Sequence, residues 1–182
     1  MAPSDLAVLP HQLDAEAATC LAIVECSRGE RNKFGYEPKL GTFQLKRLLP
    51  AGMSFPLDFG FVPSTRAEDG DPLDVMVMHD APIPMGAAVQ VRLIGVIKAE
   101  QTIEGRKVRN DRLLGVASAS LQYAEVNALK DLSERFLSSL TDFWIHYEQL
   151  RGVDFRVLGL HAAAAAVRSV MANAERPATP SH

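Results

Sequence analysis

The segment FPLDFGFVPSTRAEDGDPLDVMVM, residues Phe55–Met78, places an acidic loop between two apolar runs. Four carboxylates fall within seven residues of this loop, at Glu68, Asp69, Asp71 and Asp74. So much negative charge in a short loop is unfavourable unless a cation lies among the carboxylates. Ligands that are all oxygen suit a hard ion such as Mg²⁺. The loop therefore predicts a magnesium site, and the alternative is a solvated acidic loop that binds nothing.

The residues around the carboxylates support a shaped loop. Gly70 permits unusual backbone angles, Pro72 stiffens the turn, and the apolar run Val75–Met78 would anchor the loop to the core. A calcium loop of the EF-hand type fits less well, because Asp74 stands at the position where its sharp turn requires glycine.

Outward from this loop, residues 19–120 read mostly as short strands separated by turn signals such as Arg28-Gly29 and Glu104-Gly105. The expected strands are 19–26, 33–37, 42–48, 59–62, 74–79, 87–98 and 112–118, with a further one at 154–160. Short strands at this spacing predict a barrel or a sandwich.

Two helices are expected after the strands. Residues 133–150 repeat apolar side chains at spacings of three and four, which indicates a helix with Ser133 as its N-cap. The members of that stripe are Phe136, Leu140, Phe143, Tyr147 and Leu150. An alanine-rich helix is expected over 161–175, with Val167, Val170 and Met171 facing the core. The chain is thus predicted to form a β-barrel with helices on its outside.

Composition places the chain among globular proteins. It has 182 residues, 47% of them hydrophobic and 23% charged, which fits one domain. We expect an N-terminal arm over 1–18, a single domain over 19–175 and a flexible tail over 176–182. A net charge of −3 and only 7% aromatic residues argue against a nucleic-acid partner.

The sequence also predicts a cytoplasmic location. No signal peptide and no run of 18 apolar residues is present, so no membrane partner is expected. The two cysteines, Cys20 and Cys26, are too far apart along one strand to bridge, and we expect two reduced thiols.

Charged residues outside the loop indicate a phosphate ligand. Glu25 lies in a strand that is apolar on both faces, so it needs a partner or a metal when buried, unless it reaches solvent near Ser27. Cations gather in the β-rich region: Lys33, Lys46, Arg47, Lys98, Arg106, Lys107, Arg109 and Arg112. Beside an acidic metal loop they suggest a highly charged phosphate substrate.

These motifs together resemble the soluble family I inorganic pyrophosphatases. The resemblance covers about residues 20–160 and centres on the DGDPxD signature. The similar segments are Phe55–Pro63, Glu68–Val77, Ile23–Glu25, Arg31–Phe34, Arg47, Arg92–Val96 and Phe143–Tyr147.

The resemblance implies an α+β fold, an OB-like closed β-barrel with two main helices packed outside. It implies Mg²⁺-dependent hydrolysis of diphosphate to two phosphates, with Mn²⁺ as a possible substitute, by a homo-oligomer that is either a hexamer or a dimer. The implied metal-binding residues are Asp69, Asp71, Asp74, Glu25 and Glu100. Asp71 would also act as the base toward the attacking water. The implied phosphate-binding residues are Lys33, Arg47, Arg112 and Tyr147, the first two and Tyr147 also being catalytic.

Four positions depart from the family pattern and leave alternatives open. Gly35 replaces an acidic residue, Phe59 an aromatic hydroxyl, Asn110 an aspartate and Glu148 a lysine. Asp111 or Glu104 would have to restore the charge lost at Asn110. The altered residues favour, as alternatives, a metal- and phosphate-binding homologue with weak or altered activity, or a hydrolase of an organic diphosphate. A purely structural OB-like module is a further alternative.

Overall fold

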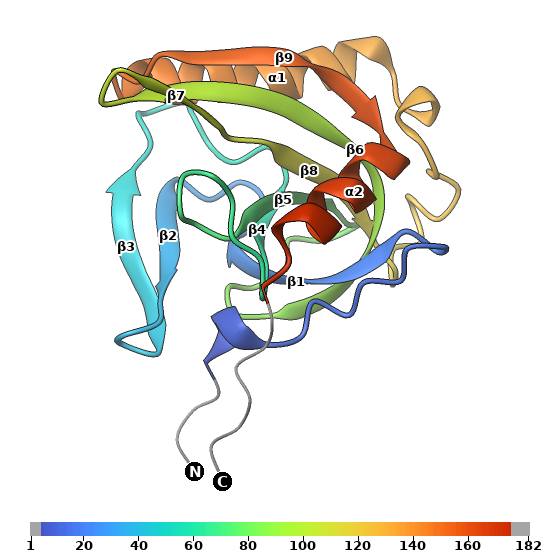
Figure 1. Ribbon diagram of the computed structural model, residues 1–182. Helices are drawn as coiled ribbons and strands as arrows, with labels where there is room; N and C mark the ends of the chain where they lie inside the picture. Colours follow the sequence, from blue (N-terminus) through green and yellow to red (C-terminus); the bar gives the residue numbers. More distant parts are fainter. Residues whose placement is uncertain (1–4, 176–182) are drawn as a thin grey trace, which may run out of the picture.

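The computed structural model describes residues 5–175, and its centre is a closed ring of strands (Figure 1). β1 (Thr19–Cys26) pairs with β4 (Asp58–Val62), and β4 pairs with β5 (Leu73–Met78). β5 runs parallel to β8 (Arg112–Ala117), which pairs with β6 (Ala88–Ile103). β6 returns to β1 and closes the ring. This ring, with two helices outside it, confirms the predicted barrel.

The remaining strands lie beside the ring. The far half of β6 pairs with β7 (Arg106–Arg109) and with β9 (Phe155–Ala162). β2 (Asn32–Glu37) and β3 (Thr42–Leu48) form a separate hairpin that stands next to the ring (Figure 1). The predicted strands are confirmed to within two residues, except that β6 continues to Ile103 and that β7 was not predicted. Polar residues in the second half of β6 concealed its length.

The two helices cover different parts of the ring. α1 (Glu134–Leu150) lies along one side of the molecule behind β9, and α2 (Ala163–Asn173) packs on β6 (Figure 1). The Ser133 hydroxyl accepts a hydrogen bond from the Phe136 N–H at 3.2 Å, which confirms the predicted N-cap. Two short 3-10 helices, Leu6–Val8 and Leu129–Asp131, complete the described elements. Among residues 5–175, none of the helices has both the length and the apolar character needed to cross a bilayer.

Two predicted core positions are wrong. Leu150 is 62% exposed because the packed face of α1 ends at Tyr147 and Glu148, before the last helical residue. Met171 is 59% exposed because it follows the buried Val170 by about 100° around α2 and so faces away from the ring.

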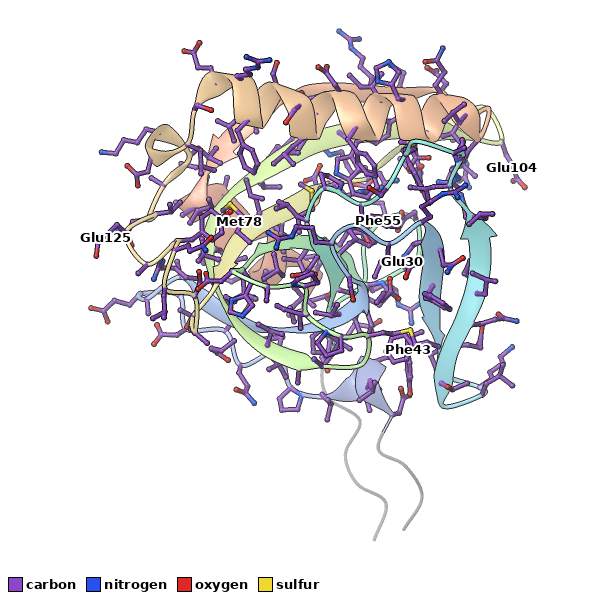
Figure 2. All side chains as sticks on the ribbon, turned by 180° about the vertical axis from the view of Figure 1, so that it is seen from behind. Glu30, Phe43, Phe55, Met78, Glu104 and Glu125 are labelled. Atoms are coloured by element: carbon purple, nitrogen blue, oxygen red, sulfur yellow. The ribbon has the colours of Figure 1, made fainter. Side chains whose placement is uncertain are left out.

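Buried apolar residues form two clusters. One fills the ring and extends beneath α2, and it includes Val24, Val75 and Leu113. The other lies between the ring and α1, and it includes Trp144 and Phe55. Figure 2 shows Phe55 below α1. This second cluster holds α1 close to the start of β5, which follows the acidic loop. The helix can therefore contribute side chains to a site at that loop.

A β-bulge in β1 sets the position of Glu25. Val24 pairs with Gly60 and Cys26 with Phe59, which leaves Glu25 as an extra residue without a partner in β4. Bulges of this kind re-aim side chains next to functional sites. A Cβ on Gly60 would lie 1.9 Å from the Ile23 carbonyl oxygen, so only glycine permits this close approach of the strands.

The residues before and after the domain are only partly described. Residues 5–18 run along the ring, where the Ala7 carbonyl accepts a hydrogen bond from the Ser64 N–H at 2.7 Å. The predicted tail over 176–182 lies outside the described residues. The division into arm, domain and tail stays a prediction.

Candidate active site

One cavity of about 700 Å³ gathers the predicted site residues. It lies where the acidic loop, the β2–β3 hairpin and the end of α1 meet. Every predicted site residue except Glu100 lines it: Glu25, Lys33, Arg47, Asp69, Asp71, Asp74, Arg112 and Tyr147. Strands far apart in the sequence therefore bring the acidic loop and the predicted phosphate-binding cations to one place.

Backbone hydrogen bonds shape the acidic loop between β4 and β5. The Ala67 N–H donates to the Asp71 carbonyl at 2.7 Å, and the Gly70 N–H donates to the Ala67 carbonyl at 3.0 Å. Gly70 has a φ of 92°, which glycine adopts without strain. The Glu68 carboxylate turns away and accepts from the Arg109 N–H at 2.9 Å. Three of the four loop carboxylates therefore face the cavity.

Asp69 and Asp71 lie together at the mouth of the loop. The Asp71 N–H donates to Asp69 Oδ1 at 3.2 Å. Burial raises the pKa of the Asp69 carboxyl; the hydrogen bond from Asp71 lowers it, and the negative charge of the Asp71 side chain raises it again. Two adjacent carboxylates, one of them exposed, present oxygen ligands that a cation would stabilise.

Glu25 and Lys33 form a buried ion pair. Glu25 is 8% exposed, which confirms the buried position expected in a strand that is apolar on both faces and not the alternative in which it reaches solvent. Its Oε2 accepts from Lys33 Nζ at 2.7 Å, and its Oε1 accepts from the Tyr36 N–H at 2.8 Å. Burial lowers the pKa of the Lys33 amine, but the charges of Glu25, Cys26 and Asp74 together with the Glu25 hydrogen bond outweigh burial, and the pKa lies above its usual value. Both oxygens of Glu25 are thus occupied in holding Lys33 and the β2 backbone.

Two further predicted phosphate-binding residues come from β3 and α1. Arg47 pairs with Lys33 across the hairpin, and its guanidinium lies 5.9 Å from the centre of the Tyr147 ring. Burial raises the pKa of the Tyr147 hydroxyl, and the nearby Arg47 charge lowers it. The hydroxyl therefore remains a neutral donor at ordinary pH, available to an anion in the cavity.

Arg112 is the most deeply enclosed cation of the site. The residue is 3% exposed, and its guanidinium stacks 4.5 Å from the centre of the Trp144 ring. Nη1 lies 2.9 Å from Asp74 Oδ2, and Nη2 lies 3.4 Å from Glu148 Oε1. Nη1 also donates to the Asn110 side-chain oxygen. Burial raises the pKa of Asp74 to about 7, although the Arg112 charge lowers it.

Glu100 does not reach the cavity, and Gln101 takes its place. Glu100 accepts from Lys107 Nζ at 2.8 Å, whereas Gln101 lines the cavity and places Nε2 3.5 Å from Asp69 Oδ2. Adjacent strand residues point to opposite faces, so only one of the two can face the site. Sequence reasoning missed Gln101 because the predicted strand ended at 98. Every second residue after Ile97 faces inward, so a longer predicted strand would have identified Gln101 as a residue of the cavity.

The four departures from the family pattern have distinct surroundings. Phe59 is 3% exposed and packs on Trp144, and Glu148 is fully buried between Arg112 and Arg151. A Cβ on Gly35 would meet the Lys46 side chain at 3.2 Å. Phe59 and Glu148 are thus enclosed by packed side chains, and Gly35 lies against Lys46.

The charge lost at Asn110 is not restored nearby. Asp111 is paired with Arg109, whose Nη2 lies 2.6 Å from Asp111 Oδ1, and it does not line the cavity. Glu104 is exposed at the tip of the β6–β7 turn, far out on the molecule (Figure 2). The cavity therefore holds two amides, Asn110 and Gln101, beside its carboxylates.

The cavity fits a divalent cation at the mouth of the acidic loop. Mg²⁺ is usually bound through one or two carboxylates, with waters and substrate phosphates completing its shell. Asp69 and Asp71 supply two such carboxylates. Within residues 5–175, no cluster of three or more His, Cys, Asp or Glu side chains forms a cage for a metal ion. A divalent ion would therefore depend on the substrate for part of its coordination.

Comparison with known proteins relates this geometry to one family. A family model described as inorganic pyrophosphatase matches residues 22–177. The inorganic pyrophosphatase of Thermus thermophilus is 33% identical over 153 residues, covering 82% of this chain and 85% of the relative. The corresponding protein of a Nostoc species is 33% identical over 155 residues, covering 85% and 88%.

Solved structures agree with the sequence comparison. The crystal structure of inorganic pyrophosphatase from Thermus thermophilus superposes with a TM-score of 0.83 at 31% identity, covering 93% of this chain and 97% of that one. The structure of an inorganic pyrophosphatase from Neisseria gonorrhoeae gives 0.82 at 26% identity, covering 91% and 94%. At these TM-scores both neighbours share the overall fold of this chain.

Proposed function

The chain belongs to the inorganic pyrophosphatase family, and from that premise we propose that it hydrolyses inorganic diphosphate to two phosphates. The observation that supports this most directly is the shared cavity. Asp69 and Asp71 line it on one side, and Lys33 and Arg47 line it from the β2–β3 hairpin. Diphosphate carries negative charge along its whole length, so it needs cations on several sides at once.

The side chains of the cavity suggest a division of roles. Lys33, Arg47 and Tyr147 would bind phosphate oxygens and stabilise the charge that develops on the leaving phosphate. Asp71 is exposed in the cavity, where it would accept a proton from the attacking water. Glu25 would act through Lys33, whose amine it holds in place.

The proposed cofactor is Mg²⁺, with Mn²⁺ as a substitute, and Asp69 and Asp71 would hold it. When bound, such an ion neutralises phosphate charge and makes a nearby water more acidic. Glu100 is left out of the proposed metal-binding set because it pairs with Lys107 outside the cavity.

The proposal extends to the compartment and the assembly. Cys20 and Cys26 are free and buried, which fits a reducing cytoplasm. Family membership supports a homo-oligomer with a small-molecule substrate and no nucleic acid. Light scattering on the purified protein measures its assembly directly, and a monomeric mass would contradict this part of the proposal.

The alternative function, hydrolysis of an organic diphosphate, has little support in the structure. It required extra room where Gly35, Phe59 and Glu148 replace polar residues. Lys46 lies against Gly35, while Phe59 and Glu148 are buried. A panel of nucleotides in competition with diphosphate should therefore show hydrolysis of diphosphate first.

The test is phosphate release from diphosphate by the purified protein, with and without Mg²⁺. We expect rapid, Mg²⁺-dependent release that falls about 10²- to 10⁴-fold in Asp71→Asn, the range typical of a lost general base. Glu68→Gln is the matched control, because its side chain belongs to the same loop but faces away from the cavity. Absence of release by the wild type would overturn the function. Near-wild-type turnover of Asp71→Asn would overturn the role of Asp71 alone.

A further inference from the structure

Arg112 lies in a site lined by oxygen atoms. Five oxygens approach its guanidinium, from Asp74, Glu148, the backbone of Asp111, and both the side chain and backbone of Asn110. The backbone distances are 3.1 Å to the Asn110 carbonyl and 3.3 Å to the Asp111 carbonyl. Several oxygens converging on one point form the usual surroundings of a bound cation, and here that cation belongs to the chain.

The fold holds Arg112 in this position. In the parallel pairing of β5 with β8, Asp74 is the register partner of Arg112. The Trp144 ring lies 4.5 Å from the guanidinium and the Phe155 ring 5.9 Å, one from α1 and one from β9. With 3% of Arg112 exposed, the side chain cannot leave without opening the packing of both elements. The charge at this point is therefore permanent.

A fixed positive charge opposes the binding of a second cation to the same carboxylate. The repulsion between a divalent ion and a guanidinium is twice that between two single charges at the same distance. Asn110 and Gln101 are neutral, so they add no negative charge to offset it. Of the acidic-loop carboxylates that line the cavity, those of Asp69 and Asp71 have no cationic partner among the described residues, whereas Asp74 pairs with Arg112.

We propose that Arg112 is a built-in cation that replaces a divalent ion at Asp74 and confines divalent metal binding to Asp69 and Asp71. The assignment rests on the proposed function, because it concerns the cation set that would face diphosphate. Asp74 then serves to position Arg112, and Arg112 presents a metal-independent charge to the substrate. Asn110 fits this arrangement because an amide oxygen accepts from Arg112 without adding a second negative charge.

The experiment counts Mn²⁺ ions bound per chain in the absence of substrate, by equilibrium dialysis and by the spectroscopic signal of free Mn²⁺. Asp74→Asn keeps an oxygen for Arg112 and should bind as many ions as the wild type. Arg112→Gln frees Asp74 and should gain one ion per chain. The double variant Arg112→Gln/Asp74→Asn should return to the wild-type count. Arg151→Gln is the matched control, since it removes a charge beside Glu148 without touching Asp74.

Loss of an ion in Asp74→Asn would overturn the assignment, as would a folded Arg112→Gln that gains none. If Arg112→Gln does not fold, the comparison of Asp74→Asn with the wild type decides alone. Phosphate release separates the two proposals. If the wild type releases phosphate but Asp74→Asn binds one ion fewer than the wild type, the proposal for Arg112 is refuted and the proposed function stands. If the wild type releases no phosphate but the variants bind the expected numbers of ions, the proposed function is refuted and the proposal for Arg112 stands.

Discussion

At the scale of single residues, Glu25 and Lys33 act as one unit. Both oxygens of Glu25 are occupied, by the Lys33 amine at 2.7 Å and the Tyr36 N–H at 2.8 Å. The Lys33 amine also lies 4.5 Å from the centre of the Phe59 ring, which limits the directions it can take. Glu25 therefore sets the position of Lys33.

This coupling leads to a prediction for diphosphate hydrolysis. Lys33→Gln removes a cation from the phosphate and should lower kcat/KM by about 10²- to 10³-fold. Glu25→Gln should lower it by about tenfold, because it loosens the amine without removing it. The double variant should be no slower than Lys33→Gln, since both changes act on one contact. Steady-state kinetics measure all three, with the exposed Glu125→Gln as control. Fully additive losses would contradict a positioning role for Glu25.

At the scale of elements, α1 links the core to the site through Trp144. The indole is 2% exposed and donates from Nε1 to the Met76 sulfur at 3.1 Å. Its ring centre lies 5.1 Å from that of Phe59, and its face carries the Arg112 guanidinium. One side chain thus packs the helix on the ring and also orients the innermost cation of the cavity.

Truncation of this side chain should be costly. Trp144→Ala should lower the free energy of unfolding by about 3–5 kcal/mol, the usual cost of removing a large buried aromatic side chain. Leu150→Ala on the same helix should change it by less than about 0.5 kcal/mol, because Leu150 is 62% exposed. Urea unfolding at equilibrium provides both values. Equal losses in the two variants would show that α1 does not pack as described.

At the scale of the whole molecule, the two core clusters each enclose one thiol. Cys20 belongs to the cluster inside the ring and Cys26 to the cluster beneath α1. Burial raises the pKa of the Cys20 thiol to about 12. Burial also raises the pKa of the Cys26 thiol to about 11, although the Lys33 charge lowers it. A thiol with a raised pKa stays protonated and unreactive until the pH approaches that value.

Both thiols should therefore resist modification in the native protein. At pH 8 the thiolate fraction should be about 10⁻³ for Cys26 and about 10⁻⁴ for Cys20, from pKa values three and four units above that pH. A thiol-specific chromogenic reagent should react at least about 100-fold more slowly with the folded protein than with the urea-unfolded protein. Ser138→Cys, at an exposed position of α1, is the fast-reacting control. Rapid labelling of the folded wild type at pH 8 would contradict the burial.

The sequence by itself determined the local elements and the family. The acidic loop, most strand positions, the Ser133 cap and the apolar stripe of α1 could be predicted because each depends on neighbouring residues. The positions of Lys33, Arg47 and Tyr147 at the cavity followed from the family motifs rather than from spacing. Predictions failed where an element ended, as at Leu150, because packing and not periodicity decides how far a buried face extends.

Only the tertiary structure decided which charges meet. The pairing of Asp74 with Arg112 depends on the parallel register of β5 and β8, and that of Arg112 with Glu148 on how α1 lies over the ring. Gln101 and not Glu100 faces the cavity because inward and outward residues alternate along β6, and the sequence did not reveal that β6 extends this far. A shift of one residue in register exchanges the inward and outward faces of a strand. Partners distant in the chain therefore cannot be assigned from local periodicity, and the cation set of this site follows from the fold.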